Sequence, residues 1–143
     1  MAYANTMSGY SMVVASCISE HAMEHAMSAY HPKLAHGAGL IMLSKEYFTF
    51  WINKHVCDDR FIDMAKLLGM KDADKPEDFI EALLKLQKDC GVDNLKMSDY
   101  GIKKEDAMTL AKNARATTQR LFNCDPAPTT DEDIAGIYER AFK

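Results

Sequence analysis

The 143-residue sequence has little that would build a β-sheet. No stretch combines period-two alternation of apolar and polar residues with the β-branched and aromatic richness of strands. The sequence also has no internal repeat and no glycine-rich phosphate loop, of either the dinucleotide-binding or the P-loop kind. We therefore expect an all-α protein.

The sequence also lacks an excess of charge of one sign and a long apolar run. It carries 17 Lys and Arg against 21 Asp and Glu, a net charge of -4, and both signs are spread along the chain. This balance argues against a nucleic-acid partner or an anionic membrane surface. The longest apolar run, residues 40–43, is far shorter than the roughly 20 residues of a membrane span. We expect a soluble protein.

The four cysteines, Cys17, Cys57, Cys90 and Cys124, include no Cys-x-x-Cys pair. The beginning of the sequence shows no signal-peptide pattern. The cysteines are therefore interpreted as reduced thiols of a cytoplasmic protein.

Apolar spacing and helix-breaking residues predict about seven helices in one domain, residues 1–143. A junction at residues 16–19 separates the first helical segment from a second that should end near Tyr30, because Pro32 disfavours helical geometry at the residue before it. Further helices are expected at 37–56, 59–68, from about 74 to 90, at 103–122 and at 131–142. In the helix ending at residue 90, Phe79, Leu83, Leu86 and Cys90 form the expected buried stripe.

Two of these helices begin with candidate capping boxes. Asp74 and Glu77 flank Pro76 at the start of one helix, and Thr129 with Glu132 precedes the last.

Histidines are the most informative residues. His21 and His25 lie four positions apart, so both point from one face of a helix, and His36 follows beside two glycines. Neutral imidazole is the commonest side-chain metal ligand, so the cluster is interpreted either as a metal site or as incidental histidines. Two or three imidazoles leave a divalent ion under-coordinated unless water or another part of a protein completes the site.

Other polar residues are assigned no role at this point. His31 precedes Pro32 and His55 is expected near a helix end, and neither is taken as a ligand. Glu20 and Glu24 fit acid/base or supporting roles, but a solvated helix face is the favoured interpretation. No Ser/His/Asp or Cys/His catalytic order is supported.

Residues 19–40 resemble the second metal-binding segment of the iron-dependent (group III) alcohol dehydrogenases, an H-x-x-x-H helix followed by a Pro-His-Gly turn. Residues 98–102 and 125–141 match the same family, so the resemblance covers essentially the whole chain. It implies a helical C-terminal domain that holds a divalent metal beside an N-terminal α/β nucleotide-binding domain. Matched residue by residue, His21 and His36 are two of the four metal ligands, and His25 is the histidine beside the metal that faces nicotinamide and substrate, the position to which we assign a catalytic role.

In such an enzyme the metal, iron in the family, polarises an alcohol or carbonyl oxygen while hydride passes to or from NAD(P). The sequence departs from the family in having no D-x-x-x-H segment, no Gly-Gly-Gly-Ser segment, and Ala35 in place of the usual proline. We therefore expect a truncated, C-terminal part that is inactive alone and binds zinc or nickel weakly. An apolar face toward the missing N-terminal domain is expected to favour self-association.

Two other functions remain open. The chain is either a stand-alone helical interaction module with incidental histidines, or a subunit that completes an active site with a separate nucleotide-binding chain. Convergence of the rings of His21 and His36 would argue against the first.

Overall fold

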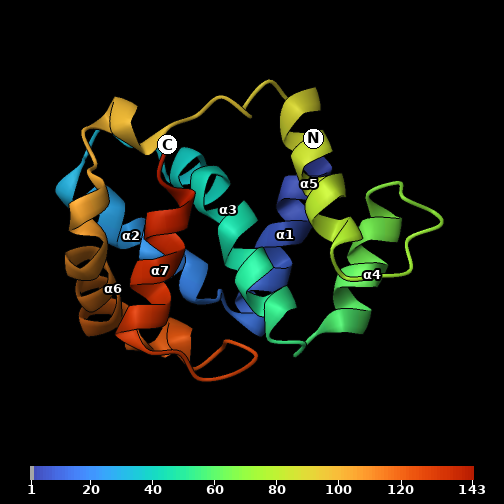
Figure 1. Ribbon diagram of the computed structural model, residues 1–143. Coiled ribbons are helices and arrows are strands. Elements are labelled where there is room, and N and C mark those ends of the chain that lie inside the picture. Colours follow the sequence, from blue (N-terminus) through green and yellow to red (C-terminus); the bar gives the residue numbers. More distant parts are fainter. Residues whose placement is uncertain (1) are drawn as a thin grey trace.

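The computed structural model describes residues 2–143, which form seven α-helices, two short 3₁₀ helices and no strand (Figure 1). The predicted all-α class is confirmed. The helices are α1 (Ala2–Ala15), α2 (Ser19–Tyr30), α3 (His36–Asn53), α4 (Asp58–Leu67), α5 (Asp78–Asp89), α6 (Ala107–Phe122) and α7 (Asp131–Ala141), and the 3₁₀ helices are η1 (Met97–Tyr100) and η2 (Lys104–Asp106).

The core lies between α2, α3, α6 and α7, which pack against one another on one side of the molecule (Figure 1). On α3, Leu43, Tyr47 and Trp51 are fully or almost fully buried at four-residue spacing, as the amphipathic pattern predicts. Each such side chain contributes roughly 1.5–3 kcal/mol by leaving water. The hydroxyl of Tyr138 on α7 donates a hydrogen bond of 2.7 Å to the carbonyl of Met23, which ties α7 to the middle of α2.

Helix α2 ends at Tyr30, as predicted from the proline that follows. His31 has φ -127° and ψ 74°, so it is not helical, in keeping with the steric restriction that a following proline imposes. The loop at residues 31–35 then reverses the chain, and α3 begins directly at His36. This turn brings the start of α3 beside α2.

The predicted stripe of α5 is wrong in its second half. Phe79 is buried, but Leu86 is 44% exposed and Cys90 is exposed, whereas Gln87 is buried. The Gln87 amide donates hydrogen bonds to the carbonyl of Ile41 and the hydroxyl of Ser44, both on α3. A satisfied amide thus occupies the contact with α3 that periodicity assigned to leucine.

Both predicted capping boxes are misplaced. Asp78, within the first turn of α5, accepts bonds from the backbone N–H groups of residues 74 and 75, so Asp74 does not cap the helix. At α7 the box is formed by Thr130 and Asp133, one position after the predicted pair of Thr129 and Glu132. Sequence patterns located these helix starts to within a few residues only.

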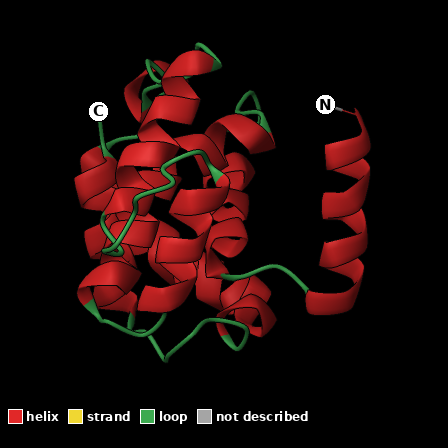
Figure 2. Cartoon of the chain, turned by 90° about the vertical axis from the view of Figure 1, so that its right-hand side faces the viewer, coloured by secondary structure: helices red, strands yellow, loops and turns green. Residues whose placement is uncertain are grey.

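Helix α1 stands apart from the other helices, joined to them by a short linker (Figure 2). None of its residues is buried. Its exposed apolar side chains include Tyr3, Tyr10, Val13 and Val14, which are 66–89% exposed. The linker turns at Ser16, which adopts a positive φ of 69°.

Two other expectations concern the described residues 2–143. Within this range no helix combines the length and apolar character needed to cross a bilayer. All four cysteines are free thiols.

Candidate metal centre

Three histidines meet where α2 passes the first turn of α3. Nδ1 of His21 lies 3.1 Å from Nε2 of His36. The ring centroids of these residues are 5.1 Å apart, and the His25 ring is 5.2 Å from the His36 ring. The structure therefore brings together all three histidines that the sequence singled out, although they come from two helices separated by a loop.

The spacing of the His21 and His36 nitrogens suits a shared cation. Two nitrogens that each lie about 2.1 Å from one metal ion, at bond angles between octahedral and tetrahedral, are separated by about 3.0–3.4 Å. The observed 3.1 Å falls in this range. Burial lowers the pKa of His21, and the neighbouring His36 and His25 lower it further. Both effects favour the neutral imidazole, which is the form that binds metal.

Glu24 is buried, not solvated, and the favoured interpretation of this residue was wrong. Its side chain is completely excluded from solvent, and Oε2 contacts Nδ1 of His36. The other carboxylate oxygen, Oε1, has no hydrogen-bond partner. Ligand atoms of Glu24, His25 and His36 lie within 4.8 Å of one another, so a carboxylate stands within the histidine cluster.

Glu20 is also buried, at 7% exposure, one residue before His21. Burial raises the pKa of its carboxyl group from 4.5 to about 8. Its Oε1 has no hydrogen-bond partner. The solvated face expected for Glu20 and Glu24 is therefore the buried side of α2.

The start of α2 is held by a residue from the loop between α6 and α7. Asp125 Oδ1 accepts a hydrogen bond of 2.9 Å from the backbone N–H of Ser19 and one of 3.0 Å from the hydroxyl of Tyr47. The hydroxyls of Ser19 and Tyr47 are 3.1 Å apart. No side chain of residue 18 caps the helix, so Asp125 supplies the missing cap from elsewhere in the chain.

A pocket of about 420 Å³ opens beside the histidines. His21, His25 and His36 line it together with Arg120 and with residues at the end of α1 and in the linker. His25 is exposed and so borders this space. The pocket places a solvent-accessible volume against one side of the histidine cluster.

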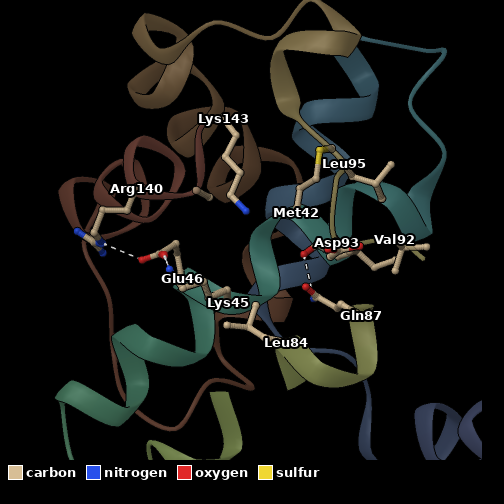
Figure 3. A pocket seen from close by; sticks show the side chains of 12 residues that line it. Met42, Lys45, Glu46, Leu84, Gln87, Val92, Asp93, Leu95, Arg140 and Lys143 are labelled. Atoms are coloured by element: carbon tan, nitrogen blue, oxygen red, sulfur yellow. Dashed lines mark hydrogen bonds and ion pairs between the residues drawn. The ribbon is translucent and has the colours of Figure 1, made fainter. Parts of the chain in front are cut away.

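Another pocket, between α3, α5 and the C-terminal residues, holds no such cluster (Figure 3). Its volume is about 70 Å³, and several of its polar side chains already have protein partners. Arg140 lies 3.8 Å from the Glu46 carboxylate, and Gln87 is bonded to α3. We assign it no ligand.

The other two histidines, which were not expected to be ligands, do not line the pocket beside the cluster. His55 follows α3 and contacts the Asp58 carboxylate at 2.9 Å. His31 is half-buried near Gly101. Sequence reasoning missed Asp125 as the cap of α2, for which no local signal exists because 106 residues separate it from Ser19.

One described family and several individual proteins are similar to this chain. Residues 1–142 match the family described as "Fe-containing alcohol dehydrogenase family, C-terminal". The long-chain primary alcohol dehydrogenase AdhA of Thermoanaerobacter ethanolicus is 30% identical over 98% of this chain and 36% of its own length. A human mitochondrial hydroxyacid-oxoacid transhydrogenase is 27% identical over 79% of this chain and 24% of its own.

Solved structures share the fold. An archaeal halo-thermophilic alcohol dehydrogenase from a Red Sea brine pool superposes with a TM-score of 0.88 at 22% identity, over 97% of this chain and 36% of that one. A 1,3-propanediol oxidoreductase superposes with a TM-score of 0.75 at 24% identity, over 89% of this chain and 33% of that one. The chain thus spans about a third or less of the length of these relatives. The chain belongs to the Fe-containing alcohol dehydrogenase family and corresponds to the C-terminal helical domain of that family.

Proposed function

We propose that this chain is the metal-binding helical part of an NAD(P)-linked alcohol dehydrogenase, with His21 and His36 as two protein ligands of a divalent ion. The separation of 3.1 Å between Nδ1 of His21 and Nε2 of His36 carries the proposal, because it matches two nitrogens on one cation. The donor set of imidazoles with a carboxylate nearby suits iron, zinc or nickel.

In this assignment His21 and His36 hold the ion, and the pocket beside them receives an alcohol or aldehyde. The bound metal supplies Lewis-acid polarisation of the substrate oxygen. His25 borders the same pocket and is exposed, so its imidazole is placed to contact a substrate or exchange a proton with it. The alcohol dehydrogenase names of the relatives support this substrate class.

Water or another protein segment would have to complete the coordination, because two imidazoles would fill only part of a divalent ion's coordination shell. The exposed apolar side chains of α1 support a protein partner at this face, namely a nucleotide-binding domain. The exposed apolar surface of α1 is equally compatible with a second candidate, a subunit that acts with a separate nucleotide-binding chain. The convergence of the His21 and His36 rings argues against a stand-alone module with incidental histidines.

Calorimetric titration with Zn²⁺ tests the proposed ligands. We expect binding to weaken at least tenfold in His21→Ala and in His36→Ala. His55→Asn serves as the matched control, since Asn tolerates the positive φ of 53° found at this position. Equal affinities of wild type and both alanine variants would remove these residues from the site.

Activity of the purified chain gives a separate test. We expect no appreciable oxidation of alcohols with NAD⁺ or NADP⁺, because a nucleotide-binding domain is required for hydride transfer. Appreciable turnover by the chain alone would contradict this part of the proposal, even if zinc binding follows the expected pattern.

A further inference from the structure

Glu24 occupies an unusual position for a charged residue. Its side chain is fully buried on α2, Oε2 contacts Nδ1 of His36, and Oε1 has no partner. Burial of a carboxylate with so few partners costs free energy that an apolar residue of the same size would not incur. Because this cost is tolerated, we expect the contact between Glu24 and His36 to have a functional role.

The first turn of α3 is shaped around this carboxylate. A Cβ atom at Gly39 would lie 2.5 Å from Cγ of Glu24, too close for any real side chain. At Gly37, two residues earlier, a Cβ would meet nothing within 4 Å. The close approach is thus specific to the residue that faces Glu24, and it lets His36 reach the carboxylate from the start of α3.

The contact determines which ring nitrogen of His36 carries the proton. When the Glu24 carboxylate is ionised it can only accept hydrogen bonds, and Nδ1 of His36 is then the donor of this contact. In the neutral ring Nε2 then has a free lone pair, and Nε2 is the atom 3.1 Å from Nδ1 of His21. Without a metal, His21 completes this arrangement by donating from Nδ1.

We propose that Glu24 is a positioning residue that holds His36 with its proton on Nδ1 and thereby presents Nε2 to a divalent cation shared with His21. This deepens the proposed metal-binding function and rests on it for the identity of the cation. Carboxylates that bond the outer nitrogen of a ligating histidine fix the tautomer and ring orientation, and their loss typically weakens metal binding 10–100-fold.

The first experiment measures the tautomer directly, without metal. Long-range ¹H–¹⁵N spectra of protein labelled with ¹⁵N-histidine distinguish protonation on Nδ1 from protonation on Nε2. We expect the Nδ1–H form for His36 in the wild-type chain at a pH where the ring is neutral. Protonation of His36 on Nε2 in the wild type would overturn the proposal whether or not any variant folds.

The second experiment compares Glu24→Met and Glu24→Gln. Methionine keeps a linear side chain but removes the acceptor, so we expect His36 to shift toward the Nε2–H form and zinc affinity to fall 10–100-fold. Glutamine retains an acceptor oxygen and should preserve more of both properties. Glu139→Met, at an exposed position on α7, is the matched control and should change neither.

The outcomes separate this proposal from the proposed function. If the wild type binds no zinc but its His36 carries the Nδ1 proton and loses it in Glu24→Met, the positioning role stands and the metal function fails. If zinc-loaded protein shows His36 bound through Nδ1 with its proton on Nε2, Glu24 is a direct ligand beside His36 and the positioning role is wrong. An unchanged tautomer in a folded Glu24→Met variant would also refute it.

Discussion

Replacing Asp125 by alanine should destabilise the protein through the start of α2. The change removes the acceptor for the backbone N–H of Ser19 and for the hydroxyl of Tyr47. Loss of a helix cap costs about 1 kcal/mol, and a buried donor left without a partner costs about 1–3 kcal/mol. Some bonding between Ser19 and Tyr47 survives, since their hydroxyls are 3.1 Å apart, so we expect a total loss of about 2–4 kcal/mol.

Urea denaturation followed by circular dichroism measures this loss, and Asp125→Asn distinguishes its cause. The asparagine oxygen still accepts both hydrogen bonds, so this variant should lose only about 1 kcal/mol. Asp72→Ala, at an exposed position, is the control for removing a carboxylate and should stay within about 0.5 kcal/mol of wild type. If Asp125→Ala unfolds at the same urea concentration as this control, the capping role assigned to Asp125 is wrong.

Four other substitutions test the packing and charge around α2. Gly39→Ala should cost about 1–3 kcal/mol by collision with Glu24, whereas Gly37→Ala should be neutral or slightly stabilising in the same melting experiment, and equal effects would contradict the close approach. Tyr138→Phe should cost about 1 kcal/mol of unfolding free energy, because it removes the bond to α2, and a variant as stable as wild type would argue against this. In metal-free protein the pKa of Glu20 is about 8 in the folded state and 4.5 in the unfolded chain, so between these pH values the carboxyl group loses its proton only on unfolding. Stability should therefore fall as pH rises through that window, by at most about 5 kcal/mol, and Glu20→Gln should flatten this slope in urea titrations at several pH values.

Local patterns predicted the helices well where a single physical cause dominates. Pro32 determines the end of α2, and α4 ends close to residue 68, the expected limit of that helix, just before Gly69 with its φ of 106°. The histidine pair on α2 and His36 also converge as their spacing suggested. At the two helix ends the determining residue lies within a few positions of the feature, and His36 is separated from the histidine pair by a single short loop.

Features that depend on distant contacts were not predictable in this way. The burial of Glu24 depends on the approach of α3 at Gly39, and the burial of Gln87 depends on acceptors on α3. From sequence alone a charged or amide side chain is predicted to face solvent, because its burial is tolerated only when a hydrogen-bonding partner is present. The cap supplied by Asp125 is the extreme case of such dependence.

The bonds that hold α2 also have a consequence for synthesis on the ribosome. Ser19 is bonded to a residue 106 positions later, and Met23 to one 115 positions later. The histidine-bearing helix therefore lacks both anchors until nearly the whole chain has been translated, and closing such long loops is slow compared with forming a local helix. A nascent chain stalled before residue 125 would carry His21, His25 and His36 without the contacts that hold α2 in place, so we expect the cluster to become organised only after that residue has been synthesised.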